Sequence, residues 1–232
     1  MRLIGETLTS FSHAPGQHLV LSIPAGGRSA RRRYTVRAFD RAELAIDIDV
    51  VLHGASPGSA WARRPFGRPL EAMGPRGRTV IDPGADWHLF SGDESALPAI
   101  FAMAEALPPT AKAVLLLEVD SAAEEQPLRT DAEVEIVWLH RRRPIQAASE
   151  ALIHATGAFA PPVGRRGHVY LLGESQTVRA QHRDLIDRGF QQTEITAEGY
   201  WRPGRQGGHE HVFEARDRGY AFARRGFRFA GA

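Results

Sequence analysis

The chain changes character near residue 83, and the part that follows restricts its possible folds most strongly. Beyond this point, continuous apolar runs such as AVLLLEV (113–119) and EVEIVWL (133–139) alternate with segments of helical character. Such runs are typical of strands that are buried on both faces of a parallel sheet. Strands are predicted at 87–92, 113–119, 133–139, 168–174 and 193–201, and helices at 94–107, 145–155 and 175–189. This alternation predicts an α/β domain in which helices cover a parallel sheet.

The first 83 residues instead contain short apolar segments separated by turn residues. Strands are predicted at 18–24, 33–39 and 43–52. The last is the clearest, because Asp47 and Asp49 alternate with an aliphatic face formed by Leu44, Ile46, Ile48 and Val50. Regularly spaced short strands with glycine and proline turns predict a small antiparallel barrel or sandwich. The expected order is a β-barrel (1–83), an α/β domain (84–204) and a polar tail (205–232).

The composition excludes several kinds of site. The chain has 232 residues, 43% of them hydrophobic, which fits one large globular domain or two small ones. It has no cysteine, which excludes disulfides, cysteine-ligated zinc, iron–sulfur clusters on protein thiolates and a thiol nucleophile. No apolar run is long enough to span a bilayer, and the first residues lack the apolar core of a signal peptide. We therefore expect a cytoplasmic protein without membrane insertion.

The charge pattern argues against nucleic-acid binding. The formal net charge is +2, and Lys112 is the sole lysine among many arginines. A surface that binds nucleic acid gathers its cations on one face. Here arginines alternate with acids, as in EARDRGYAFARR (214–225), so most of them are predicted to be solvated surface. The sequence leaves open that some arginines form a local positive patch that binds an anionic small molecule.

Two predicted strands end in similar turns. FSGDESALP follows the strand at 87–92, and LLGESQTVR follows the strand at 168–174. Each turn has a glycine, an acid and then a serine that opens a helix. The serine is predicted to cap the helix, and free helix amides can receive a phosphate. The alternative is an ordinary capped turn, since neither G-x-G-x-x-G nor a Walker A loop is present.

Arginines surround a tyrosine in the stretch RRRYTVRAFD (31–40). Strand alternation places Arg32 and Tyr34 on one face, with Arg31 and Arg33 on the other, in solvent. One interpretation is a plain surface strand. The other is a site in which a cation binds phosphate and the aromatic ring faces a flat ligand.

Taken together, these motifs resemble a known family. RRYT, VLHG followed by PGSAWA, GDESALPAI, LLGES and GYWRPG occur in the order found in siderophore-interacting proteins, which are flavin-dependent ferric-siderophore reductases of the ferredoxin-reductase-like superfamily. The resemblance covers roughly residues 10–205. It implies an N-terminal antiparallel FAD-binding barrel and a C-terminal parallel-sheet domain that binds NAD(P)H. Family members carry an additional strand before the stretch LIGETLTSF, so a barrel that lacks its first strand is expected.

The resemblance also implies roles for single residues. Arg32 would pair with the FAD pyrophosphate, Tyr34 would stack on the isoalloxazine ring, and Thr35 would hydrogen-bond near flavin N5. The FAD phosphates and adenosine would be lined by His53, Gly58, Ser59, Ala60 and Trp61. The family usually has the pattern G-P-A-x-x-W-A in this segment, and this sequence departs from it at Ser56-Pro57-Gly58. Near the adenine half of FAD or the domain junction would lie Asp93, Glu94 and Ser95. The reduced nicotinamide nucleotide would bind at Gly173, Glu174 and Ser175.

The implied activity is electron transfer from NADH or NADPH through FAD to a ferric siderophore, which then releases Fe(II). The cofactor supplies the chemistry, so no catalytic acid, base or nucleophile is assigned. Cations for an anionic siderophore are expected at Arg37, Arg63, Arg64, Arg202 and Arg205. No metal site is predicted, because His209 and His211 around Glu210 are better explained as a solvated turn. Two alternatives stay open, a general flavin reductase and a non-catalytic binding protein that has lost FAD. The choice between NADH and NADPH, the siderophore and the oligomeric state are not predicted.

Overall fold

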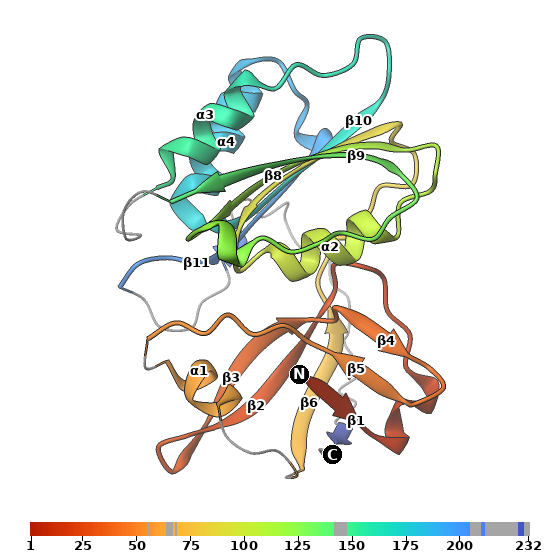
Figure 1. The fold of residues 1–232 in the computed structure, drawn as a ribbon, viewed down its shortest axis with the longest axis vertical. Coiled ribbons are helices and arrows are strands. Elements are labelled where there is room, and N and C mark those ends of the chain that lie inside the picture. The colour runs from red at the N-terminus through yellow and green to blue at the C-terminus, as the bar shows by residue number, and fades with distance from the viewer. Residues whose placement is uncertain are drawn as a thin grey trace. The chain divides into compact units, whose positions relative to one another are not determined.

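A computed structural model describes residues 1–54, 56–63, 67, 69–141 and 148–204, together with the backbone of residues 210–211 and 227–229. The chain forms two compact units (Figure 1). The first contains Met1–Val80 and the short strand β13 (Phe227–Phe229), and the second begins at Ile81 and contains β12 (Glu210–His211). Both short strands lie within the stretch predicted as a polar tail. Each unit is considered separately below.

The first unit consists of two antiparallel sheets. A three-stranded sheet has the order β1 (Arg2–Ile4), β5 (Ala45–Asp47), β4 (Ala38–Asp40). A four-stranded sheet has the order β13, β6 (Leu70–Arg76), β2 (His18–Ala25), β3 (Arg28–Thr35). The 3-10 helix η1 (Glu6–Ser10) and the helix α1 (Pro57–Ala62) complete this unit. The predicted barrel-like antiparallel unit is confirmed.

Aliphatic side chains from both sheets form the core of this unit. On β2, Leu19, Leu21 and Ile23 alternate inward and are at most 1% exposed. They pack against Ile46 and Ile48, which come from the predicted aliphatic face of residues 43–52. Burial of such side chains contributes about 1.5–3 kcal/mol each, which makes the sheet pairing specific.

The strand predicted at 43–52 is much shorter in the structure. Residues 41–44 form the turn of the β4–β5 hairpin, in which Asp40 Oδ1 accepts hydrogen bonds from the amides of Ala42 and Glu43 at 3.0 Å. Leu44 takes the left-handed backbone conformation, with φ of 47°, so it cannot continue a strand. Only Ala45–Asp47 pairs on both sides, with β1 and β4. Similarly, the predicted strand at 33–39 is divided between β3 and β4.

The second unit is built on a parallel sheet with the order β11 (Ile195–Trp201), β10 (Gly167–Glu174), β7 (Trp87–Asp93), β8 (Lys112–Val119), β9 (Glu133–His140). The short strand β12 pairs antiparallel with β11 at one edge. All five predicted strands are present. Within this sheet the first strand, β7, lies in the middle. β8 and β9 follow on one side of it, and β10 and β11 follow on the other side. The strand order therefore reverses between β7 and β10.

Helices cover both faces of this sheet (Figure 1). On one face, α2 (Leu97–Glu105) packs on a core that includes Phe90, Leu115 and Tyr170. On the other face, α3 (Glu150–Ala158) and α4 (Ser175–Asp187) enclose a second core, around Leu89 and Leu171. Two 3-10 helices, η2 (Ala122–Glu124) and η3 (Gln192–Glu194), lie in connections. The predicted α/β domain is confirmed. Among the residues that the structure describes, no helix has both the length and the apolar character needed to cross a membrane.

A buried histidine makes the second unit sensitive to acid. His88 on β7 is 2% exposed and stacks near Phe90 and Tyr170, and its Nδ1 atom has no hydrogen-bond partner among the residues that the structure describes. Burial, assisted by the charge of His168, lowers the pKa of His88 to about 4. In the unfolded chain the His88 imidazole takes up a proton below about pH 6.5, whereas in the folded chain it takes up a proton only below about pH 4.

We expect His88 to reduce the free energy of unfolding by about 2 kcal/mol between pH 7 and pH 5. Urea unfolding of the wild type and of His88→Phe at a series of pH values measures this loss as the difference between the two pH dependences, because the raised pKa of Asp93 acts in the opposite direction over the same range. His88→Phe keeps an aromatic ring of similar size and should remove the loss over this range. An equally steep pH dependence in His88→Phe would show that another group is responsible.

Candidate functional site

In the first unit, β3 presents an arginine and an aromatic ring on the same face. Arg32 and Tyr34 are partly buried, whereas Arg31 and Arg33 are exposed on the opposite face, as the alternation predicts. The Nη1 atom of Arg32 donates to the carbonyl oxygen of Arg31 at 2.9 Å. Among the residues that the structure describes, no carboxylate forms an ion pair with Arg32. Its guanidinium therefore keeps most of its donors for a ligand.

Tyr34 is fixed by tight packing. Its ring lies 5.8 Å from that of Trp61, measured between centroids. A Cβ atom added to Gly58 would approach the Tyr34 hydroxyl to 2.7 Å, so only glycine allows α1 to lie this close. Burial raises the pKa of Tyr34, and the charge of Arg32 opposes this rise, which places the guanidinium near the phenol. Tyr34 is therefore a neutral, preorganised aromatic surface.

Ser59 holds the loop before α1 rather than facing solvent. Its side chain is fully buried, accepts a hydrogen bond from the amide of His53 at 3.0 Å and donates to the carbonyl oxygen of His53 at 3.0 Å. Ser56 caps the helix by accepting from the amide of Ser59 at 3.2 Å. His53 and Ala60 are exposed on this segment, and Thr35 is partly buried at the end of β3. The structure thus places the predicted cofactor residues of this unit on two neighbouring stretches, 32–35 and 53–61.

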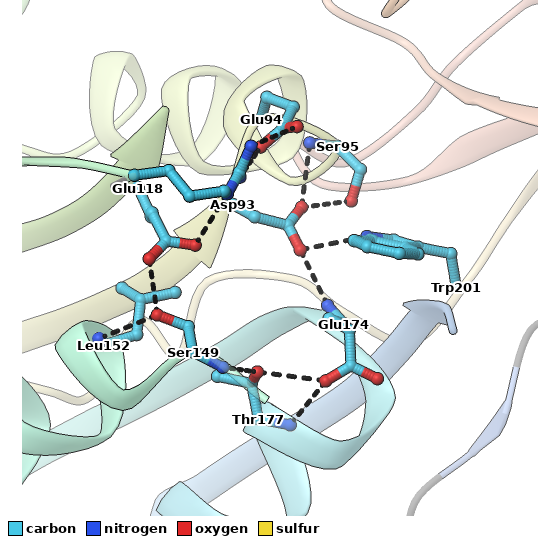
Figure 2. A network of polar contacts seen from close by, with 10 residues as sticks. Asp93, Glu94, Ser95, Glu118, Ser149, Leu152, Glu174, Thr177 and Trp201 are labelled. Atoms are coloured by element: carbon cyan, nitrogen blue, oxygen red, sulfur yellow. Dashed lines mark hydrogen bonds and ion pairs between the residues drawn. The ribbon is translucent and has the colours of Figure 1, made fainter. Parts of the chain in front are cut away.

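In the second unit, Asp93 connects the turns at the carboxyl ends of several strands (Figure 2). It ends β7, is 3% exposed, and accepts four hydrogen bonds. Its Oδ1 accepts from the amide and the hydroxyl of Ser95, at 2.9 and 2.5 Å. Its Oδ2 accepts from the amide of Glu174 at 2.8 Å and from the indole Nε1 of Trp201 at 2.9 Å. This point lies where the strand order reverses, the usual ligand position in such sheets.

The environment of Asp93 perturbs its ionisation. Burial raises the pKa of Asp93 to about 6, and the negative charge of Glu94 adds to this rise. The hydrogen bonds from Ser95 and Trp201 act in the opposite direction because they stabilise the carboxylate. A titratable group of this kind at a strand end is characteristic of functional sites.

Glu174, and not Ser175, caps α4. The Glu174 carboxylate accepts hydrogen bonds from the amides of Gln176 and Thr177 at 2.9 and 2.8 Å, and it is 4% exposed. Ser175 instead donates its hydroxyl to the carbonyl oxygen of Trp201 at 3.0 Å. The predicted serine cap is therefore wrong at this turn. Glu174 immediately precedes α4, and its carboxylate already binds the first free amides at the N-terminus of the helix. These amides are therefore not free to bind a phosphate.

The predicted serine cap is also wrong at the turn after β7. Ser95 lies before α2, and its amide and hydroxyl both bind Asp93. The N-cap position of α2 is Ala96, which has no side chain able to cap. In both turns, the acid that follows the glycine organises the local donors, and the serine does not.

An arginine that the motifs did not predict lies at the end of the neighbouring strands. Arg141 follows β9 and binds Glu94 through Nη1 and Nη2, at 3.2 and 2.5 Å. Its Nε also donates to Glu118 at the end of β8, at 3.3 Å. Glu118 in turn accepts from the hydroxyl of Ser149 at 2.5 Å (Figure 2). No motif marks Arg141 or Glu118 in the sequence. The only signal is that each lies at or just after the end of a predicted strand.

The predicted cations for the substrate lie in different parts of the chain. Arg37 in the first unit pairs with Asp49 at 3.7 Å, and Arg63 is exposed and donates to the carbonyl oxygen of Gly54 at 3.3 Å. Arg202 is partly buried in the second unit. Arg64, Arg205 and His209 lie outside the described residues, as does the side chain of His211. Within the described part of the chain, no group of three or more histidine and acidic side chains could hold a metal ion.

Comparison with known proteins identifies the family. The model for the siderophore-interacting FAD-binding domain matches residues 5–79, and that for siderophore-interacting protein matches residues 85–204. A siderophore utilization protein from T. fusca has a TM-score of 0.81 and 31% identity, covering 90% of this chain and 88% of its own. The ferric vibriobactin reductase of Vibrio cholerae is 34% identical over 178 residues, which span 75% of this chain and 65% of that protein.

A more distant structure shares the fold alone. A ferredoxin NADP+ reductase from Neisseria gonorrhoeae is 16% identical, with a TM-score of 0.61 that covers 86% of this chain and 91% of its own. The ferredoxin-reductase-like fold expected from the motifs is therefore confirmed. The two family models together match most of the chain, in the order that the motifs predicted: the chain belongs to the siderophore-interacting protein family.

Proposed function

We propose that this protein is an FAD-containing reductase that transfers electrons from NADH or NADPH to a ferric siderophore. The observation that carries the proposal is the pairing of Arg32 and Tyr34 on one face of β3, within a stretch that matches a siderophore-interacting FAD-binding domain. The relative from Vibrio cholerae is named as a ferric vibriobactin reductase, which supports the same class of substrate.

The residues of the first unit fit FAD. The cofactor combines a flat aromatic ring with a pyrophosphate, so it needs a fixed aromatic surface and a cation with free donors. Tyr34, packed against Trp61 and Gly58, meets the first requirement. Arg32, which has no carboxylate partner among the described residues, meets the second, because a guanidinium binds phosphate through two parallel hydrogen bonds.

In the proposed mechanism the protein binds and orients, and it transfers no proton of its own. Bound FAD would supply the redox chemistry between the reduced nicotinamide and Fe(III). Arg32 would hold the pyrophosphate, Tyr34 would support the flat ring, and Thr35 would contribute a hydroxyl beside it. The second unit receives the dinucleotide at the strand ends around Asp93 and Gly173. Fe(II) leaves because the hard oxygen donors of a siderophore bind it weakly.

A visible spectrum and an electron-transfer assay test this function. The purified protein, after incubation with FAD and removal of the excess, should be yellow, and NADH or NADPH should bleach it without oxygen. Addition of a ferric siderophore should restore the colour and yield Fe(II), detected with a ferrous chelator. A protein that takes up no FAD would contradict the proposal. Faster turnover of free flavin than of ferric siderophore would instead identify a general flavin reductase.

Turnover of an anionic ferric siderophore should fall as the salt concentration rises. The proposed substrate cations include Arg37, Arg63 and Arg202, and attraction by partly exposed charges is screened by salt. The second-order rate constant, measured at low and high ionic strength, should fall steeply for an anionic chelate and little for a neutral hydroxamate chelate. Arg202→Ala combined with Arg205→Ala should reduce the slope for the anionic chelate. Equal slopes for both chelates would exclude a role for these cations.

A further inference from the structure

Asp93 is the point at which the carboxyl ends of three strands of the second unit meet. It lies at the end of β7, and its carboxylate reaches Ser95 in the following turn, the amide of Glu174 at the end of β10, and the indole of Trp201 at the end of β11. All four hydrogen bonds are donated to Asp93 and none is donated by it (Figure 2). A single carboxylate thus sets the relative position of three chain segments.

Close packing leaves this arrangement little freedom. A Cβ atom on Gly173 would lie 2.6 Å from Asp93 Oδ2, and a Cβ atom on Gly199 would lie 2.4 Å from Ser175 Oγ. Ser175 is itself tied to the carbonyl oxygen of Trp201. The end of β10 therefore packs tightly on Asp93 and β11 packs tightly on Ser175, and both contacts require glycine.

Building on the function proposed above, we propose that Asp93 is the positioning residue of the nicotinamide-dinucleotide site. Its carboxylate holds the turn after β7 and the carboxyl ends of β10 and β11 in the arrangement that accepts the coenzyme. The place follows from the sheet, because the strand order reverses between β7 and β10 and ligands bind beyond the carboxyl ends at such a point. Asp93 acts through its neighbours, since it is almost fully buried and its oxygens are already engaged.

The same geometry makes the arrangement depend on protonation. An ionised Asp93 carboxylate accepts hydrogen bonds from all four donors. A protonated carboxyl group carries a hydrogen on one oxygen, and that hydrogen would point at a donor and disrupt its hydrogen bond. Since the pKa of Asp93 is raised to about 6, this change falls between pH 5 and pH 7. Coenzyme binding should therefore weaken as the pH falls through about 6.

Other titratable groups surround Asp93 on each neighbouring element. Glu94 follows it in the same turn and raises its pKa, and Glu118 is its register partner on β8. On β11, burial raises the pKa of Tyr200 strongly, and the charges of Glu198 and Asp93 add to this rise, so Tyr200 stays neutral throughout this range. The Glu174 carboxylate is turned toward the amides of α4. Glu94 is thus the neighbour whose removal should change the titration of Asp93 most directly.

The indole N–H of Trp201 reports on Asp93 directly, and it needs neither FAD nor turnover. We would record its proton and nitrogen chemical shifts in the whole chain from pH 5 to pH 8, with Trp201→Phe to assign the signal. The signal should titrate with a midpoint near pH 6, and Asp93→Asn should abolish the titration. Glu94→Gln should move the midpoint down, because a negative charge is lost, and Ser95→Ala should move it up, because a donor is lost.

Coenzyme binding is then followed on the same signal by titration with NAD+. The dissociation constant should rise at least tenfold from pH 7.5 to pH 5 in the wild type, and Asp93→Asn should show the weakened value at every pH. In turnover, Asp93→Asn should raise the half-saturating NADH or NADPH concentration far more than it lowers kcat. FAD uptake by the wild type, measured separately, distinguishes failure of the flavin assignment from loss of the coenzyme site.

Opposite shifts, in Glu94→Gln and Ser95→Ala, of the pH midpoint at which NAD+ binding weakens are the decisive result, because a role of Asp93 in folding alone would not produce them. They can be measured even if Asp93→Asn does not fold. An unchanged midpoint in both variants would overturn the proposal, as would NAD+ binding that is independent of pH in the wild type. A wild type that binds NAD+ in this pH-dependent way but takes up no FAD would support the role of Asp93 and contradict the proposed reductase.

Discussion

Arg32→Ala is expected to weaken FAD binding by roughly ten- to a hundredfold, which corresponds to about 1.5–3 kcal/mol. The reason is that Arg32 shares its face of β3 with Tyr34 and, among the described residues, has no acidic partner that would compete for its guanidinium. Loss of the side chain removes a charge-assisted contact to the pyrophosphate and leaves the aromatic surface in place. Quenching of flavin fluorescence during titration of the apoprotein measures the dissociation constant.

Arg33→Ala is the matched control for this experiment. It removes the same charge from the next position of the same strand, but Arg33 is exposed on the opposite face. We expect its FAD affinity to stay within about twofold of the wild-type value, because a solvated charge at this distance is largely screened. Equal losses in the two variants would indicate a general electrostatic attraction, and no loss in Arg32→Ala would remove Arg32 from the site.

The parallel sheet of the second unit was predictable from the sequence because its strands are buried on both faces. In β8, for example, the run from Ala113 to Val119 contains only one charged residue, Glu118, and β7 and β10 are buried along their whole length. A continuous apolar run bounded by turns leaves few alternatives. The three helices were also predicted, although α2 begins only at Leu97, because Asp93 and Ser95 organise the preceding turn. The helix predicted at 145–155 is α3, Glu150–Ala158, and residues 145–147 lie outside the described part of the chain.

The antiparallel unit was harder to predict because its strands are short and irregular. β6 contains Gly74 and Pro75 and was not predicted, since glycine and proline usually interrupt strands. β1 also escaped the analysis, and in the structure it pairs with β5 at the edge of the three-stranded sheet. Pairing between distant segments creates these strands, and local sequence carries little trace of such pairing.

The residues of the candidate site could be found from motifs, but their partners could not. Asp93, Gly173 and Glu174 were named from their turns, yet the contact between Asp93 and Trp201 joins residues that are 108 positions apart. Arg141 likewise meets Glu94 across 47 positions. The motifs also failed to distinguish the capping acid from the serine beside it. That choice depends on which side chain reaches the helix amides and which reaches Asp93, and only the folded sheet determines it.

Gly173→Ala should destabilise the second unit by roughly 2–5 kcal/mol, a combined effect of backbone strain and collision. The backbone of Gly173 has φ of 121°, which a side chain disfavours, and the new methyl group would lie 2.6 Å from Asp93 Oδ2. Neither problem can be relieved cheaply, because Asp93 is held by Ser95, Glu174 and Trp201. Urea unfolding followed by tryptophan fluorescence measures the loss, and the Trp201 indole signal should move as the hydrogen bond to Asp93 is disturbed.

Gly189→Ala separates the two causes. Gly189 follows α4 with φ of 95°, but a Cβ atom there would meet no atom within 4 Å. This substitution therefore adds strain without collision and should cost only about 1–2 kcal/mol. It should also leave the Trp201 signal and NAD+ binding at their wild-type values. If Gly173→Ala and Gly189→Ala destabilise the protein equally and neither affects NAD+ binding, then the close approach of Gly173 to Asp93 has no role in shaping the coenzyme site, and only the backbone conformation explains why glycine is needed at position 173.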